Sequence, residues 1–494
     1  MRFGRFGFTY RFLPSKTHFR IMTPNYESWS KDELIARLKE LEAKKHPKST
    51  HSPTSKKPFH FSSHPKRKIA IKFCYSGWEY NGLAYQNGPT PLPTVEDVLF
   101  KAFVKARLVD ETGGLDGCGW EKCGRTDRGV SAAGQVVSLW VRSALPTETS
   151  SKVTSSPPSE DVSTEDTPQN TSLQSSTKHE LRYVSILNRL LPPTIRVLAW
   201  SSISPDFSAR FNCKHRHYKY FFTSHGLDVS LMQSAANHLV GEHDFRNMCK
   251  LDPGKQITNF HRCVMRAQIN PLSPESDGDN RVYVFDLVGS AFLYHQVRHI
   301  MALLFLVGTG VEQPSIIPAL MNVFHAESDS STKSPLPLVD RKPEYQMADA
   351  LPLMLWDCAY ADSDVTWQTD GDGTESGAGS DLYHQLHSIH QRSLIHTVLD
   401  EHFFTAATQY HSPPPQYFPF SQTGLTPHTL PHSTSGREPV LGVPLGAGTY
   451  KRNARYIPLL ERKRLDHVDV ANERWRIGRG SKYSKQKTSD DGTE

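Results

Sequence analysis

The segment of the sequence best equipped for chemistry is CGRTDRGVSAAGQ, residues 123–135. In it Asp127 lies between Arg125 and Arg128, and a glycine stands on either side of this charged group. An arginine beside a carboxylate favours the ionised form of that carboxylate. Asp127 is therefore either one half of a structural ion pair or a nucleophile, and the residues by themselves favour the ion pair.

Other motifs of common chemistry are incomplete in this chain. It has no GxxxxGK[ST] loop, which argues against nucleoside triphosphate chemistry. Cys118 and Cys123 lack both the CxxC spacing and the second pair of a zinc knuckle. His295 and His299 have the spacing of a zinc-protease helix, but Gln296 stands where the glutamate base is required. We therefore expect no metal and no cofactor, and interpret these histidines as ordinary helix residues.

The composition narrows the class of protein further. The chain has 494 residues, which suggests roughly three domains of about 150 residues, and only 37% are hydrophobic. No run approaches about 18 consecutive apolar residues, so we expect no membrane-spanning helix. Seven scattered cysteines do not form a disulfide framework, and we expect reduced thiols inside a cell. The net charge of +6 weakly favours an anionic partner.

The elements that must position Asp127 can be predicted from the surrounding pattern. Residues 69–73 alternate between large apolar and smaller or polar side chains, which predicts a half-buried strand. Thr94, with Asp97 three residues later, forms the capping box of a helix. Residues 136–141 follow the motif and are apolar on both faces, which predicts a buried strand.

A second block of the sequence repeats these ingredients. We expect helices over residues 184–191, 230–240 and 293–308, and strands over residues 195–200, 217–223, 262–269 and 281–289. Strands therefore alternate with helices in both blocks. This pattern predicts an α+β fold in which the sheets of two similar halves join and helices cover one face.

The remaining segments are poor in large apolar residues or rich in charge. Ser30 and Glu33 form a capping box that predicts a short helix over residues 30–45, and the stretch up to Lys68 is basic and free of acids after Lys44. We divide the chain into an N-terminal extension (1–66), a first catalytic subdomain (67–143), a disordered insertion (144–179), a second catalytic subdomain (180–362), a mostly disordered insertion (363–435) with a helical patch, and a basic C-terminal segment (436–494).

Three segments in order make the sequence recognisable. CGRTDRGVSAAGQVVSL, FSARFNCKHRHYKYFF and SAFLYHQVRHIMALLFLVG resemble the three motifs of the tRNA pseudouridine synthase A family, and GEHDFRNMCK also matches. The resemblance covers roughly residues 68–143 and 180–325 and, more weakly, the C-terminal tail. The loop YNGLAYQ has Leu83 where many members have tryptophan, and this form is similar to the eukaryotic branch that acts on uridines 38 and 39 of tRNA.

The resemblance implies a role for four residues. Asp127 matches the catalytic aspartate, and Arg125 matches the arginine that helps to turn out the target nucleotide. Tyr218 matches the tyrosine that packs on the target base, and Arg298 matches the arginine that pairs with the catalytic carboxylate. Two other interpretations stay open: Tyr218 could be a core residue of its strand, as we expect for Tyr220, and Arg298 could lie on a helix surface.

The resemblance also implies the fold and the function. We expect a pseudouridine-synthase-like α+β fold with a catalytic cleft between two halves, and an isomerase that needs no cofactor. Its partner would be tRNA, modified in the anticodon stem-loop, and a homodimer is one arrangement we consider. The alternatives are a non-catalytic tRNA-binding protein or chaperone, and a branch with other target positions. We expect nucleus and cytoplasm as location, with a mitochondrial pool if residues 1–21, basic and free of acids, act as a transit segment.

Overall fold

A computed structural model gives the structure of the chain. It describes residues 59–146, 179–272, 281–324, 336–370, 378–411, 441–453 and 456–480, together with Ser30, Lys31, Ile35 and Arg37. Outside the described residues lie the segment 1–21, whose composition suggested a transit segment, the basic arm up to residue 58 and most of the first insertion (147–178). Residues 61–494 form one compact unit, distinct from residues 1–60.

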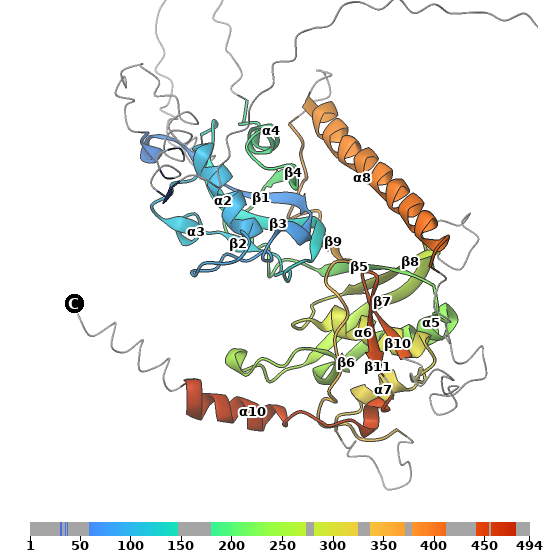
Figure 1. The fold of residues 1–494 in the computed structure, drawn as a ribbon. Helices are drawn as coiled ribbons and strands as arrows, with labels where there is room; N and C mark the ends of the chain where they lie inside the picture. The colour runs from blue at the N-terminus through green and yellow to red at the C-terminus, as the bar shows by residue number, and fades with distance from the viewer. Residues whose placement is uncertain are drawn as a thin grey trace, which may run out of the picture. The chain divides into compact units, whose positions relative to one another are not determined.

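One nine-stranded mixed sheet forms the centre of this unit (Figure 1). All of its paired strands are antiparallel except β3 and β9, which run parallel through the pairs Ser131–Met354 and Ala132–Leu355. In spatial order the strands are β4 (Ile195–Ser202), β1 (Lys66–Tyr75), β3 (Ser131–Arg142), β9 (Leu353–Ala359), β5 (His215–Thr223), β8 (Val282–Gly289), β7 (His261–Pro271) and β6 (Gly241–Asp244), with β2 (Glu121–Lys122) beside β3.

The helices pack on this sheet around two hydrophobic cores. The side chain of Thr94 accepts a hydrogen bond from the amide of Asp97 and so begins α2 (Val95–Lys105), as the capping box predicted. Phe103 of α2 and Phe305 of α6 (Gln296–Gly308) are buried in separate cores, and burying such a ring contributes about 1.5–3 kcal/mol. The other α-helices in the described ranges are α3 (Gly114–Gly117), α4 (Tyr183–Asn188), α5 (Val229–Asn237), α7 (Ile316–Met321), α8 (Ala378–Thr408) and α10 (Val468–Trp475).

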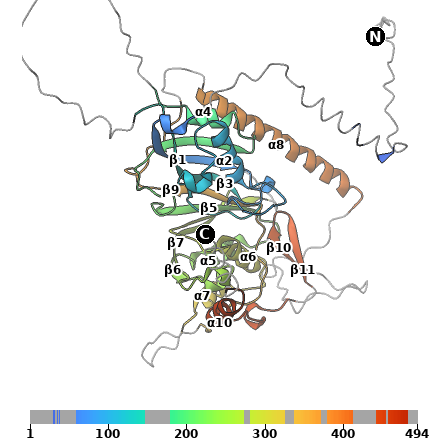
Figure 2. The same ribbon diagram turned by 90° about the vertical axis from the view of Figure 1, so that its left-hand side faces the viewer.

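A β-hairpin from the C-terminal part of the chain completes the second core. Its strands β10 (Leu441–Gly446) and β11 (Thr449–Asn453) lie beside α6 in both ribbon views (Figures 1 and 2). The Tyr220 hydroxyl donates to the carbonyl oxygens of Asp349 (3.1 Å) and Leu445 (3.3 Å), and the side chain is fully buried. Tyr220 is therefore a core residue, as predicted.

The second insertion is partly ordered. Gln368 bridges to Trp200 of β4, so the chain stays on the sheet beyond residue 362. α8 covers the expected helical patch, and its described side chains, from residue 382 on, are almost all exposed. Residues 371–377 and 412–435, predicted to be disordered, lie outside the described residues. None of the helices in the described ranges has the length and apolarity needed to cross a bilayer.

Candidate active site

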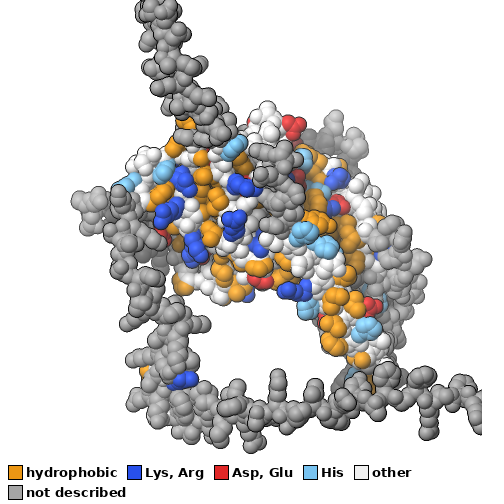
Figure 3. All heavy atoms as spheres, turned by 90° about the horizontal axis from the view of Figure 1, so that it is seen from above, with side chains coloured by type: hydrophobic (Ala, Val, Ile, Leu, Met, Phe, Trp, Pro, Cys, Tyr) orange, Lys and Arg blue, Asp and Glu red, His pale blue; other side chains and the backbone are white. Residues whose placement is uncertain are grey.

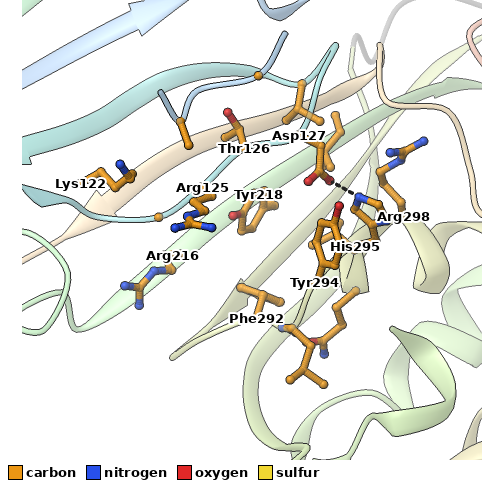
Figure 4. Close-up of a pocket in the computed structure, with 18 of the residues that line it drawn as sticks. Lys122, Arg125, Thr126, Asp127, Arg216, Tyr218, Phe292, Tyr294, His295 and Arg298 are labelled. Carbon is orange, nitrogen blue, oxygen red and sulfur yellow. Dashed lines mark hydrogen bonds and ion pairs between the residues drawn. The ribbon is translucent and has the colours of Figure 1, made fainter. Parts of the chain in front are cut away.

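A cavity of about 1100 Å³ contains all four residues predicted for the site. Its walls come from the segment 122–130, from the loop after β1, from β5 and from the segment 291–298 that leads into α6. Figure 4 shows Asp127, Tyr294, His295 and Arg298 on one side of this space, Arg125 and Arg216 on the other, and Tyr218 between them. Segments far apart in the sequence thus meet at one place.

Asp127 has a partner that the sequence analysis missed. Its Oδ2 lies 3.2 Å from Nε2 of His295, and the side chains of Asp127 and His295 are 24% and 7% exposed. The other ring nitrogen, Nδ1, is buried without a hydrogen-bond partner among the described residues. The imidazole of His295 is therefore oriented toward Asp127.

The backbone of His295 explains this orientation. His295 has left-handed dihedral angles (φ 59°, ψ 12°), so that α6 begins only at Gln296 and not at Leu293 as expected. Non-glycine residues rarely adopt this conformation, although histidine does so more often than most. Our interpretation of His295 and His299 as two ordinary helix residues is therefore wrong for His295. The helical spacing could not show this, because His295 lies outside the helix.

The loop that carries Asp127 is fixed by the segment after β1. The Tyr75 hydroxyl shares a hydrogen bond with the Thr126 hydroxyl (2.5 Å), and the Leu83 amide donates to the Thr126 carbonyl (3.2 Å). The Gly77 amide donates to the Ser131 hydroxyl (2.9 Å), and a Cβ at Gly77 would lie 2.1 Å from the Val130 carbonyl oxygen. Only glycine allows this approach, so the aromatic and glycine-rich loop is the support of the Asp127 loop.

Tyr218 lies on β5 and lines the cavity. Its ring contacts that of Phe292 edge to face, with 5.1 Å between ring centres and 86° between planes. Burial raises the pKa of the Tyr218 phenol well above its usual range, so that the hydroxyl stays protonated at neutral pH. The aromatic side chain of Tyr218 therefore lies in the same cavity as the Asp127 carboxylate, whereas Tyr220, two residues later on β5, points into the core.

The two predicted arginines differ in their contacts. Arg125 is exposed at the cavity, and no ion pair between Arg298 and Asp127 occurs in the described part of the structure. Instead Nε of Arg298 donates to the carbonyl oxygen of Ala348 (2.8 Å), which fixes its guanidinium beside the cavity. The pairing of Arg298 with the catalytic carboxylate stays a prediction.

Arg216 is a further residue that sequence reasoning missed. Its guanidinium donates to the carbonyl oxygens of Ser290 (2.7 Å), Cys123 (3.0 Å) and Arg210 (3.0 Å). These three carbonyls belong to different segments that meet at the cavity, so Arg216 joins them. An arginine in a strand offers no local signal of this role.

The comparisons with known proteins agree on one family. A model described as tRNA pseudouridine synthase matches residues 235–361. The chain is 42% identical over 365 residues to a tRNA pseudouridine(38/39) synthase of Saccharomyces cerevisiae, covering 69% of this chain and 73% of that protein. It is 39% identical over 356 residues to a protein of the same description from Homo sapiens (70% and 67%). A tRNA pseudouridine synthase A of Methanothrix thermoacetophila is 31% identical over 305 residues (61% and 86%).

The chain belongs to the tRNA pseudouridine synthase family. The resemblance of its three motifs is thereby confirmed, and the protein is a tRNA pseudouridine synthase enzyme.

The charges in the cavity suit the substrate of a tRNA pseudouridine synthase. Among the described residues that line it, Asp127 is the sole acid, whereas eight are lysine or arginine: Lys122, Arg125, Arg128, Arg210, Arg216, Lys255, Arg262 and Arg298. A concave surface with this excess of positive charge attracts a polyanion. The one carboxylate is thus placed where the phosphate backbone of a tRNA would be drawn in.

His299, one helical turn after His295, does not line the cavity of this synthase. Burial, and then the nearby Lys342 ammonium, lower the pKa of the His299 imidazole to about 2. Its Nε2 lies 3.1 Å from Nζ of Lys342, on the side of α6 that faces the core. In the described ranges, no group of three or more His, Cys, Asp or Glu side chains is placed to hold a metal ion.

Proposed function

We propose that this synthase isomerises uridines 38 and 39 of tRNA to pseudouridine, with Asp127 as the reacting group. The observation that carries the catalytic role is a single carboxylate in a basic cavity, next to the aromatic ring of Tyr218. The target positions are supported by the yeast and human relatives, which are described as acting at positions 38 and 39.

The reaction breaks the bond between N1 of uracil and C1′ of the ribose, turns the base and forms a bond from C5 of uracil to C1′. The C5–H bond breaks as its proton is removed, and N1 gains a proton in its place. Atoms and electrons are conserved and no water is added, so the chemistry requires no redox partner. Asp127 acts either at C1′ or as a base toward a proton of the nucleotide. A path through an intermediate divides one difficult step into two easier ones.

The target nucleotide must leave the base stack to reach Asp127. Extrusion costs a few kcal/mol, and stacking of one base on an aromatic side chain returns about 1–3 kcal/mol. Tyr218 offers that aromatic side chain in the lining of the cavity. In this proposal Arg125, exposed at the cavity, contacts the backbone of the extruded nucleotide, and Arg298 adds positive charge beside the carboxylate.

The proposal includes the finer architecture expected from the sequence. The first catalytic subdomain (67–143) and the second (180–362) would form two similar halves on the joined sheet, with the catalytic cleft between them. Asp127 would come from the first half, and Tyr218, His295 and Arg298 from the second. The distribution of cavity residues over β5, the segment before α6 and the segment 122–130 supports this arrangement.

The test is a map of pseudouridine in total tRNA from cells with and without this protein. We expect the modification to disappear at positions 38 and 39, and to return with the wild-type gene but not with Asp127→Asn. Purified Asp127→Asn should still bind tRNA, because the basic residues around the carboxylate remain. Loss at other positions would contradict the target assignment. Turnover by the Asp127→Asn variant would contradict the catalytic role, and a non-catalytic binder would leave the map unchanged.

A further inference from the structure

The C-terminal helix α10 contacts a wall of the cavity from outside. This wall is the segment 250–257, which includes the short helix η6 (Pro253–Lys255). Nδ2 of Asn472 donates to the carbonyl oxygen of Ile257 (3.3 Å), and the Asn472 carbonyl accepts from Nε2 of Gln256 (3.3 Å). Asn472 is only 7% exposed. A buried polar side chain is thus used to join two segments more than 200 residues apart in the sequence.

Two further contacts extend this junction along the helix. The Trp475 ring stands over Gly254, where an added Cβ would lie 3.7 Å from the ring. The Arg476 guanidinium donates to Oε1 of Gln256 (3.1 Å). Gln256 itself has left-handed dihedral angles (φ 48°), a conformation that a non-glycine residue keeps only where its surroundings impose it. Those surroundings include the contacts with α10 and the hydrogen bonds from the amide and the side chain of Gln256 to the Pro253 carbonyl.

Residues of this wall in turn contact residues of the active site. Nζ of Lys255 lies 3.9 Å from the centre of the Tyr294 ring, and the Lys250 amide donates to the Tyr294 carbonyl (2.8 Å). The Tyr294 ring packs on that of His295 with 3.9 Å between ring centres. Lys255, Ile257 and Tyr294 all line the cavity. A continuous series of contacts therefore runs from Asn472 to the histidine that pairs with Asp127.

We propose that α10 is the support that holds the Lys255–Tyr294 wall of the active site, with Asn472 as a positioning residue. This inference rests on the proposed function of Asp127 and goes beyond it, because it gives the C-terminal segment a part in catalysis. A wall displaced by about 1 Å can lower a rate by up to about a hundredfold. We expect the effect in the single-turnover rate of bound tRNA, because α10 positions the wall and does not touch the carboxylate itself.

The experiment compares Asn472→Ala with Val470→Ala, a change on the same helix at a side chain that is 50% exposed. We expect Asn472→Ala to lower the single-turnover rate at saturating tRNA by about tenfold, with a melting temperature near that of Val470→Ala. Val470→Ala should match the wild type. Lys255→Ala should also lower the rate, and the double variant Asn472→Ala/Lys255→Ala should be no slower than Lys255→Ala.

Hydrogen exchange gives a second measurement that does not depend on activity. Amides of residues 250–257 should exchange faster in Asn472→Ala than in Val470→Ala. Unchanged exchange there, or a rate equal to that of the wild type, would overturn the role of α10. Additive losses in the double variant would also overturn it, because Asn472 would then act by another route. A wild type without turnover on tRNA would instead refute the proposed function, and the exchange measurement would still decide the role of α10.

Discussion

Tyr218 shows how one side chain separates a catalytic from a structural interpretation. If the Tyr218 ring stacks on the extruded uracil, Tyr218→Phe keeps this stacking platform. Activity then falls only through the loss of proton transfer by the hydroxyl, which is worth at most about 10²–10⁴-fold. Tyr218→Leu removes the platform and should be slower still. A purely structural tyrosine predicts that Phe is harmless and that Leu mainly lowers the melting temperature. Melting curves and single-turnover rates of both variants distinguish these patterns.

His295 leads to a prediction about the orientation of Asp127. Asn tolerates left-handed dihedral angles, so His295→Asn should melt within a few degrees of the wild type. It loses the imidazole contact to a charged group, which is worth about 1.5–3 kcal/mol, so the single-turnover rate should fall by about 10- to 100-fold. tRNA affinity should change little.

The matched control for this variant is His238→Asn, an exposed histidine away from the cavity, which should behave as the wild type. A full rate for His295→Asn would show that the imidazole does not orient Asp127.

At the scale of elements, a buried lysine joins the segment before β9 to α6. Nζ of Lys342 donates to the Cys249 carbonyl (2.5 Å) and lies near the His299 ring. Lys342 is only 6% exposed. Burial lowers the pKa of the Lys342 ammonium from its usual 10.5 to about 8. A charged lysine is thus retained in the core next to the first turns of the helix that follows His295.

This burial predicts a pH dependence of stability. Between about pH 8 and 10.5 the unfolded state binds more protons at Lys342 than the folded state, so the free energy of unfolding rises with pH. The free energy of unfolding rises by about 3 kcal/mol over this range, because each pH unit between the two pKa values contributes about 1.4 kcal/mol. The Lys342→Met variant should lack this rise in the free energy of unfolding. Urea unfolding of both proteins at pH 7.5, 9 and 10.5 measures the difference, and parallel curves would contradict the assignment.

At the scale of the whole molecule, the basic N-terminal extension is separate from the catalytic unit. The compact unit begins at Phe61 and β1 at Lys66, so a deletion that tests the extension must end at His60. Lys and Arg outnumber Asp and Glu in residues 1–60. On the face of the molecule seen from above, Lys and Arg side chains are interspersed with apolar ones (Figure 3).

Deleting residues 1–60 should weaken tRNA binding and flatten its dependence on salt. Each lost phosphate contact lowers the slope of log K against log salt by about 0.9 for a duplex. Deleting residues 147–178, which carry no excess of Lys and Arg, is the matched control and should leave the slope unchanged. Equal slopes for all three proteins, measured between 50 and 200 mM salt (roughly the range over which such contacts are lost), would mean that the extension makes no phosphate contacts.

The sequence by itself determined several of the elements and the family, whereas β9, which joins β3 to β5, was not predicted. The capping box at Thr94, the apolar run before Gly308 and the alternation of Tyr218 with Tyr220 are local patterns, and each predicted its element correctly. Three motifs in order identified the family, because a catalytic site preserves residue types at short spacings. These features need no knowledge of distant contacts.

Only the tertiary structure decided which side chains meet. His295 pairs with Asp127 across 168 positions of the chain because a left-handed residue delays the start of the expected helix to Gln296, and periodicity carries no sign of such a turn. Arg216 joins three carbonyls, and Asn472 supports Ile257, through long-range packing of the sheet and the C-terminal helix. Local patterns report which face of an element is buried, whereas the partner on that face is set by the folding of the whole chain.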